Sequence, residues 1–256
     1  MQGYVEFEPE PRLISHVVCL WRHTFVGKGP HSHRILPDGC VDIVLMGDSE
    51  PMVVGPDTKA ALISFDKPTE ILGIRLMPGV AASVLREDVS NLRDQTIPLA
   101  EFRPGSRGTL HDRLLSASEW KQRLNQLQGA VFDRPPAVDR RVTGAVAVVA
   151  REPHLRIDGL ASTYGLTSRQ LLRLFEAHVG YGPKTLARVF RLQRALAVAR
   201  RGSGTFADLA FAAGYADQSH MNREFKQLSS SIPSRLLPRA STVTMSDLFK
   251  TAFAQI

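Results

Sequence analysis

The sequence predicts an α+β protein: a β-rich N-terminal domain, built as a sandwich or small barrel, followed by an all-α domain with two helix-turn-helix units joined by a long helix. Short apolar segments broken by turn residues fill the first half of the 256 residues. Amphipathic helical periodicity runs through the second half, which is also much more basic. The length agrees with two domains, since one domain typically has about 100–200 residues.

The first half contains five short segments that are apolar or β-branched. Clusters of Gly, Pro and Asp separate them, as at Pro37–Gly39 and Gly47–Pro51. Closely spaced strands with such turn signals are typical of antiparallel sandwiches and small barrels. The predicted strands are Val17–Phe25, Val41–Met46, Met52–Val54, Ala60–Phe65 and Ile71–Leu76.

Helical segments and a linker follow the strands. Apolar residues take helical spacing over Val80–Leu85, and a second helical stretch, Thr109–Leu127, closes the first domain. Pro135 and Pro136 mark a linker, because two successive prolines cannot continue a helix. The predicted domains are residues 1–133 and 134–240, with a C-terminal tail at 241–256.

From Val138 onward the pattern is almost entirely helical, and it repeats. In each repeat a short helix ends at a glycine, Gly165 or Gly214, and a second helix follows a brief turn. The spacing beyond the glycine differs slightly, so the repeat is approximate within the second helix. The predicted helices are Asp139–Arg151, Ile157–Tyr164, Ser168–Val179, Lys184–Arg201, Phe206–Ala213 and Gln218–Leu228.

The charge is distributed unevenly. Residues 1–133 contain 14 Lys and Arg against 17 Asp and Glu, whereas residues 134–240 contain 17 against 7, a net +10. An acidic module joined to a basic one is typical of a sensing or protein-facing domain attached to a nucleic-acid-binding domain. Charge alone would equally suit a protein at a membrane surface. Two tandem helix-turn-helix patterns inside the basic segment favour DNA.

The C-terminal segment carries a specific resemblance. Residues 214–237, GYADQSHMNREFKQLSSSIPSRLL, closely resemble the signature of the AraC/XylS transcription regulators. Residues 160–196, LASTYGLTSRQLLRLFEAHVGYGPKTLARVFRLQRAL, are similar to the first unit and linker helix of that family. Met221 stands where an aromatic residue is usual, and Ser230 where glycine is usual. The resemblance implies a sequence-specific DNA-binding transcription regulator.

The same resemblance implies which side chains face DNA. Arginine can pair with guanine, and glutamine or asparagine with adenine, while a phosphate contact is the alternative for each. His220 matches the Ser-His pair of the family and is either a base contact or a structural cap. The candidates are Arg169, Gln170 and Arg173 in the first unit, and Gln218, Ser219, His220, Asn222 and Arg223 in the second.

The linker helix is rich in arginine. These side chains are either phosphate anchors or a solvated helix face. They are Arg188, Arg191, Arg194, Arg200 and Arg201.

The run HSHRILPDGCVDIVLMG, residues 31–47, together with Pro78–Gly79, resembles an N-terminal domain of unknown role found before such DNA-binding domains. The family implies a cupin-like sensor that binds a small molecule. His31, His33 and Cys40 raise the alternative of a metal site, but a fourth ligand is not evident. We therefore expect a polar loop before Val41, and neither a metal nor another cofactor.

Two alternatives of other classes stay open. One is a DNA-repair or thiol enzyme with a fused DNA-binding domain, which would need a reactive thiol at Cys19 or Cys40. The other is an architectural DNA binder, which the acidic first half argues against. The sequence shows no Gly-x-Ser-x-Gly, phosphate-loop or His-Glu-x-x-His motif, so we expect no enzyme.

Double-stranded DNA is the predicted partner. A small-molecule effector, RNA polymerase and a second copy of the chain, as a homodimer, are further candidates. The sequence has no apolar run of about 18 residues, so no membrane contact is expected. Its two cysteines form no disulfide framework and its N-terminus has no apolar leader, which indicates the cytoplasm.

Overall fold

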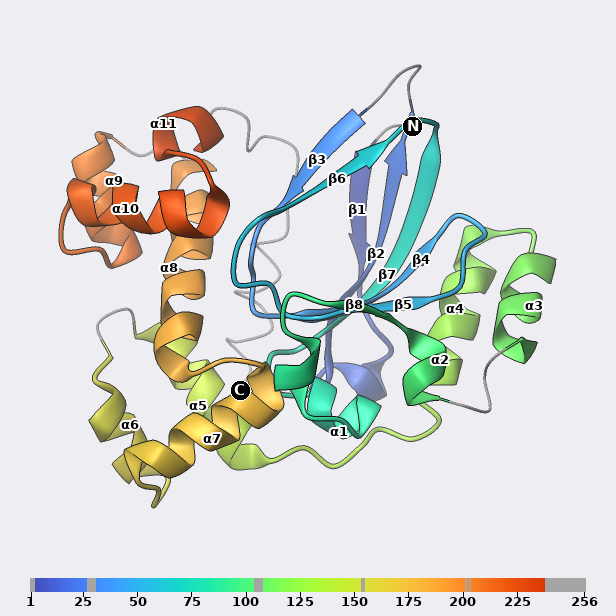
Figure 1. The fold of residues 1–256 in the computed structure, drawn as a ribbon, viewed down its shortest axis with the longest axis horizontal. Helices are drawn as coiled ribbons and strands as arrows, with labels where there is room; N and C mark the ends of the chain where they lie inside the picture. The colour runs from blue at the N-terminus through green and yellow to red at the C-terminus, as the bar shows by residue number, and fades with distance from the viewer. Residues whose placement is uncertain are drawn as a thin grey trace.

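The computed structural model describes residues 3–26, 31–103, 108–152, 155–200, 202 and 204–237. Within them every strand precedes residue 99, and all regular structure from Arg140 onward is helical (Figure 1). The predicted order, a β-rich part followed by an all-α part, is confirmed. The predicted tail, 241–256, lies outside the described residues. None of the described helices is long and apolar enough to cross a membrane.

A six-stranded antiparallel sheet is the centre of the β-rich part, in the order β1-β2-β7-β4-β5-β8. Two other strands pair with each other as a separate antiparallel unit, which we call the β3–β6 ribbon. The strands are β1 Gly3–Phe7, β2 Val17–Phe25, β3 His31–Ile35, β4 Val41–Met46, β5 Met52–Val54, β6 Ala61–Phe65, β7 Thr69–Leu76 and β8 Thr96–Pro98.

One sequence prediction for this part was wrong. Residues 31–35 form strand β3 instead of a polar loop, and His33 lies opposite Ile63 of β6. The partner strand is about 30 residues further along the chain, so the local sequence gives no sign of the pairing. The other five predicted strands are present, three of them with the predicted bounds.

The two faces of the sheet differ, because successive strand residues point to opposite sides. One face carries Leu20, Ile43 and Ile74, which share a buried core with Leu124 and Leu127 of helix α4, Trp120–Val131. The opposite face is partly covered by the β3–β6 ribbon, so the sheet lies between helices and ribbon (Figure 1).

The ribbon is attached to the sheet by an aromatic cluster. The rings of Phe25 and Phe65 are 4.5 Å apart, and His33 meets His23 edge-on at 5.1 Å. Burial, and next the neighbouring His33, lower the pKa of His23 to about 4. Burial also lowers the pKa of His33. Both imidazoles are therefore neutral at pH 7 and pack as aromatic rings.

Short helices complete the β-rich part. The predicted helical stretch 109–127 is interrupted, because Ala117 and Glu119 take extended backbone conformations. The helices are α1 Ala81–Leu85, α2 Leu99–Phe102, α3 Thr109–Ser116 and α4 Trp120–Val131, with short 3-10 helices at Pro11–Leu13 and Val89–Leu92.

The helices of the second part match the predicted ranges to within one or two residues. Their starts are fixed by side-chain caps, which satisfy backbone N–H groups that lack partners inside the helix. Thr167 and Thr205 form capping boxes, and Asp139 and Asp217 each accept one backbone N–H. The helices are α5 Arg140–Arg151, α6 Ile157–Thr163, α7 Ser168–Val179, α8 Pro183–Arg200, α9 Phe206–Ala213, α10 Gln218–Ser229 and α11 Pro233–Leu236.

The described residues form two hydrophobic cores, and a junction joins them. The first core draws on the sheet and α1 to α4, the second on α5 to α10. Leu36 of the β-rich part packs against the second core, and Val138 against the first. At Gly180 an added Cβ would lie 2.6 Å from Pro56, so the two parts approach closely there.

The end of α10 shows how the chain tolerates serine where the family usually has glycine. Ser230 has a left-handed backbone, with φ of 54°. This conformation costs roughly 1 kcal/mol for a residue with a side chain. We therefore expect Ser230→Gly to raise the free energy of unfolding by about 0.5–1 kcal/mol in urea denaturation. Ser83→Gly inside α1 is the control and should lower it. A destabilising Ser230→Gly would show that the serine side chain matters more than the backbone strain.

Candidate nucleic-acid interface

The two predicted helix-turn-helix units are α6–α7 and α9–α10. In each, a glycine with positive φ ends the first helix: Gly165 at 65° and Gly214 at 89°. The next residue, Leu166 or Tyr215, donates its backbone N–H to the carbonyl five residues earlier, at 2.9 Å in both units. The repeat seen in the sequence is therefore matched by a repeat in the backbone geometry at the end of each first helix.

The second turn is one residue longer than the first. Thr167 caps α7 two residues after Gly165, whereas Asp217 caps α10 three residues after Gly214. Both helices then run for 12 residues. Because of this one-residue insertion, the repeat is only approximate in sequence. Counted from the start of each helix, Arg173 and Arg223 occupy the same position.

Each second helix buries one side and exposes the other. The buried sides contain Leu171 and Phe175 in α7, and Met221 and Phe225 in α10, all 0% exposed. The candidate DNA-facing residues lie mostly opposite. Arg169, Gln170, Arg173, Gln218, Ser219 and Arg223 are exposed, and His220 and Asn222 are half-buried.

Gln170 also takes part in the start of α7. Its side-chain oxygen accepts hydrogen bonds from the backbone N–H of Thr167 at 2.9 Å and from the Thr167 hydroxyl at 3.0 Å. This is one half of the capping box. The side-chain amide NH₂ is then the part of Gln170 that could reach a base.

His220 is turned toward the protein. Its Nδ1 accepts the backbone N–H of Ala216 at 3.3 Å, which puts a ring proton on Nε2, 3.5 Å from Oε1 of Glu224. The tautomer follows from these partners. Of the two interpretations left open by the sequence, this geometry favours the structural cap.

Leu172 was missed as a candidate. It is 42% exposed on α7 and occupies the position equivalent to Asn222 of α10. An apolar side chain on a recognition helix can contact the methyl group of thymine. The sequence could have identified Leu172, because it does not share the helix face on which Leu171 and Phe175 are buried.

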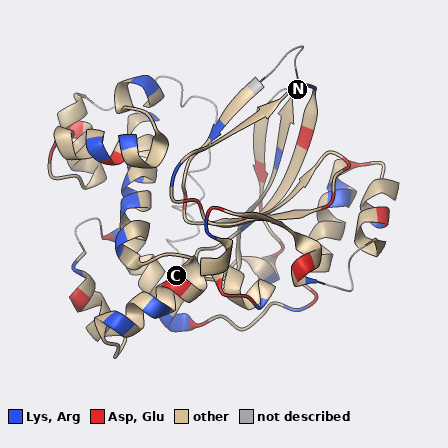
Figure 2. Ribbon diagram, viewed as in Figure 1, with Lys and Arg blue, Asp and Glu red and all other residues tan. Residues whose placement is uncertain are grey.

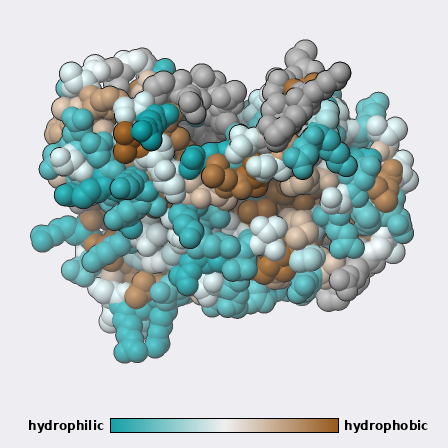
Figure 3. Space-filling model, turned by 45° about the horizontal axis from the view of Figure 1, so that its top comes forward, coloured by the Kyte–Doolittle hydropathy of each residue, from teal (hydrophilic) through white to brown (hydrophobic). Residues whose placement is uncertain are grey.

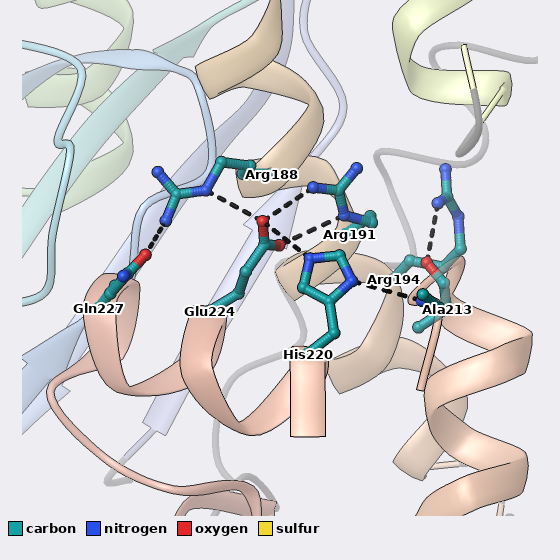
Figure 4. Close-up of polar contacts among 8 residues, drawn as sticks. Arg188, Arg191, Arg194, Ala213, His220, Glu224 and Gln227 are labelled. Carbon is teal, nitrogen blue, oxygen red and sulfur yellow. Dashed lines mark hydrogen bonds and ion pairs between the residues drawn. The ribbon is translucent and has the colours of Figure 1, made fainter. Parts of the chain in front are cut away.

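An ion-pair cluster holds α10 against the linker helix α8 (Figure 4). Glu224, 8% exposed, accepts from Nε of Arg188 at 3.0 Å and from Nη2 of Arg191 at 2.9 Å. Arg188 also donates to Gln227. In this structure Arg188 and Arg191 therefore pair with Glu224, a role that neither sequence interpretation, phosphate anchor or solvated helix face, had included. Glu224 was not predicted as a structural residue, because the pattern of charges along the sequence does not show which arginines a glutamate pairs with.

The carboxyl group of Glu224 is held ionised. Burial alone would raise its pKa, but hydrogen bonds and charge from Arg191 and Arg188 outweigh burial, so the pKa lies below the ordinary 4.5. The cluster is therefore fully charged at neutral pH.

Arg194 has a structural position too. It donates to the carbonyl of Ala213 at 3.1 Å and to that of Ala150 at 2.7 Å. These carbonyls are at the ends of α9 and α5, where helix C=O groups lack intrahelical partners. Arg194 thus joins two helix ends to α8, a role that neither the phosphate nor the solvated-face interpretation had included. Arg201 lies outside the described residues.

The basic residues follow the helical part of the molecule. Figure 2 shows Lys and Arg along α5, α7, α8 and α10. On the linker helix α8, the side chains of Arg188, Arg191 and Arg194 make contacts within the protein. The exposed positive charge of the recognition helices α7 and α10 comes from residues such as Arg169, Arg173 and Arg223.

The two cysteines are poorly placed for nucleophilic chemistry. Both are free thiols and both are buried. Burial raises the pKa of Cys19 to about 12 and that of Cys40 well above its ordinary value. The thiolate is the reactive form of cysteine, so this geometry disfavours a thiol enzyme.

We accordingly expect neither thiol to react with iodoacetamide in the folded protein at pH 8, and both to react in urea. Mass spectrometry of the alkylated chain would count the modified thiols. Rapid labelling of Cys19 or Cys40 in the folded protein would revive the thiol-enzyme alternative.

The fold and this surface define a tandem helix-turn-helix DNA-binding protein. The linker helix α8 has 18 residues and so spans roughly 27 Å. Successive turns of a major groove recur every ~34 Å. One chain can therefore present α7 and α10 to consecutive major-groove segments.

Comparison with known proteins agrees with this class. A family described as a helix-turn-helix domain matches residues 160–239, and a domain of unknown function matches residues 5–98. The probable bifunctional transcriptional activator/DNA repair enzyme AlkA of Mycobacterium tuberculosis is 39% identical over 85 residues, which is 33% of this chain and 17% of that protein. The match thus spans less than a fifth of this relative's length.

Solved structures with a similar outline include ToxT of Vibrio cholerae. One ToxT structure covers 88% of this chain and 99% of its own, at 12% identity and a TM-score of 0.48. Another, bound to an unsaturated fatty acid, covers 85% and 94%, at 12% identity and a TM-score of 0.47. Residues 160–239 thus match a helix-turn-helix domain family, in agreement with the AraC/XylS-like signature of the sequence, and residues 5–98 match a domain family of unknown function.

Proposed function

We propose that this protein is a sequence-specific transcription regulator that reads two consecutive major-groove segments, with α7 in one and α10 in the next. The observation that carries the proposal is the pair of exposed arginines, Arg173 and Arg223, at the same position of two recognition helices of equal length. The protein acts by binding DNA in the cytoplasm, and no chemical step is assigned to it.

Within this proposal the two modules have separate roles. Residues 1–133 sense an effector and residues 134–240 bind DNA, a division supported by the two hydrophobic cores. Contact with RNA polymerase and assembly as a homodimer remain predictions from the family resemblance.

Selection of duplexes from random-sequence DNA by the full-length protein tests the central claim. We expect one preferred sequence with two recognised segments about 10 base pairs apart, centre to centre. Binding should weaken steeply with salt. Failure to enrich any sequence would contradict sequence-specific regulation. Release of altered bases from alkylated DNA by the protein would instead favour a repair enzyme.

We propose that the effector is a small organic molecule. The sheet face beside the ribbon carries Met46, 38% exposed, and the half-buried Met52 and Val54 of β4 and β5. Figure 3 shows hydrophobic side chains gathered near the middle of the face drawn, flanked by hydrophilic ones. A largely apolar surface suits an organic ligand.

A metal is not part of this proposal. Among the residues that the structure describes, no group of three or more His, Cys, Asp or Glu side chains could hold a metal ion. The side chain of His31 lies outside that description. Native mass spectrometry after mild purification would test the effector, and stoichiometric zinc or iron in the same sample would contradict an organic one.

A further inference from the structure

The C-terminal end of α10 is capped by the β-rich part of the chain. The last carbonyl groups of a helix have no partners within it. The carbonyl of Leu228 accepts the backbone N–H of Ala60 at 2.6 Å, and that of Ser229 accepts Nη1 of Arg34 at 2.7 Å. Both donors come from the β3–β6 ribbon or the residue just before it. The N-terminal part thus completes a helix that belongs to the second helix-turn-helix unit.

The ribbon reaches α10 with one side and the sheet with the other. Arg34 and His33 are neighbours on β3, so their side chains point to opposite faces. His33 packs in the aromatic cluster against the sheet, and Arg34 donates to Ser229. Figure 1 shows the ribbon between the main sheet and the helices α8 and α10. It is therefore a direct physical connection between the sheet and α10.

The segment after β3 is attached to α8. Nε2 of Gln193 donates to the carbonyl of Pro37 at 2.6 Å. An added Cβ at Gly39 would lie 2.8 Å from Leu186 and 3.4 Å from Phe190, so the backbone approaches α8 closely. The segment that follows β3 is therefore fixed to the linker helix, and the adjoining end of the ribbon, at Arg34 and Ala60, is fixed to the end of α10.

These contacts leave the recognition surface open. Gln218, Ser219 and Arg223 are exposed, and the ribbon meets α10 at its last residues. The ribbon therefore holds the helix from its C-terminal end and does not cover the side expected to meet DNA. The positive guanidinium of Arg34 also suits the negative end of the helix dipole.

We infer that Arg34 is a positioning residue for DNA recognition: from the N-terminal part it fixes the orientation of the second recognition helix, α10. This inference rests on the proposed DNA-binding function. It makes the affinity for the DNA segment read by α10 depend on a residue more than 180 positions earlier in the chain. The first recognition helix, α7, has no contact with Arg34 among the described hydrogen bonds and ion pairs.

The DNA test uses the full chain and the duplex that the wild-type protein selects from random-sequence DNA. Arg34→Ala should weaken binding about three- to tenfold, the effect of one hydrogen bond of average strength. Hydroxyl-radical footprints should lose protection in one of the two segments, the same one that Arg223→Ala affects. The slope of affinity against salt should not change, because Arg34 contacts the protein and not a phosphate.

Two variants control for charge and for folding. Arg34→Lys keeps a positive donor and should restore most of the affinity. Arg22→Ala removes the Arg22–Glu70 ion pair of the main sheet, 2.7 Å long, and the contact of Arg22 with the Trp120 ring of α4. Neither contact involves residues 134–240, so DNA binding should be unchanged. Equal loss over both segments, a lower salt slope, no loss, or tighter binding by Arg34→Ala would each overturn the inference.

Hydrogen exchange without DNA separates this inference from the proposed function. In Arg34→Ala the amides at the end of α10, Phe225 to Ser229, should exchange faster, while those of α7 keep their rates. Unchanged exchange in α10 would overturn the inference even if the protein binds DNA. If no duplex is selected, the proposed function fails, and faster exchange would still establish the positioning contact.

Discussion

Arg223→Ala is expected to weaken binding to the preferred duplex by about 1–3 kcal/mol and to relax base preference at one position, because a bidentate arginine–guanine contact has that value. Arg173→Ala should do the same at one position of the other segment, since the two arginines occupy equivalent places on α10 and α7. Both side chains are exposed and absent from the ion-pair cluster that fixes α10, so their removal should not disturb the fold.

Measurements on matched and single-base-mismatched duplexes at two salt concentrations distinguish base reading from phosphate contact. Lys226→Ala, at another exposed position on α10, is the control, and we expect a uniform loss on all sequences with a salt slope lower by about one. Equal losses on matched and mismatched duplexes for Arg173→Ala and Arg223→Ala would make these arginines phosphate contacts. Arg194→Ala is unsuitable as a control, because Arg194 caps two helix ends.

The helical half could be predicted closely because its signals are local. Thr167, Thr205 and Asp217 start helices through their own side chains, and Gly165 and Gly214 end them by taking positive φ. These effects act within one turn of helix, so the sequence alone places the boundaries.

The β-rich half was only partly predictable, because strand pairing is not local. β2 and β4 each contain a run of apolar residues and were found, whereas β1, β3 and β8 are short, and β3 is also polar. Antiparallel pairing of β3 with β6 supplies the backbone hydrogen bonds that polar side chains do not indicate. The order of strands in the sheet likewise depends on contacts between distant residues.

The candidate DNA surface was predicted better than the contacts that support it. Exposed positions such as Arg169 and Arg223 follow from helical periodicity around buried residues. The partners of Arg188, Arg191 and Arg194 do not, because a basic side chain on a helix can face solvent, a phosphate or a carboxylate. The same limit hid Arg34, whose partner belongs to the other half of the molecule.

Glu224→Ala is expected to lower the free energy of unfolding at pH 7 by about 2–3 kcal/mol. Removing one partner of a buried ion pair leaves the other charge uncompensated, which costs about 3–5 kcal/mol for fully buried groups. We expect less here, because the side chain of Arg188 is 33% exposed and that of Arg191 15%. Glu70→Ala, which breaks the ion pair with Arg22 at the surface, is the control and should cost no more than about 1 kcal/mol.

The pH dependence gives a second test of the same cluster. The pKa of Glu224 is lower in the folded protein than its ordinary 4.5, so the unfolded chain takes up the proton first as the pH falls. The stability that this carboxylate contributes is therefore complete above pH 4.5 and is lost as the pH decreases through the folded pKa. Urea unfolding of the wild type and of Glu224→Gln, which cannot ionise, should give curves that differ at pH 7 and converge below pH 4.5. A difference that stays constant with pH would mean that Glu224 stabilises α10 by packing and not by its charge.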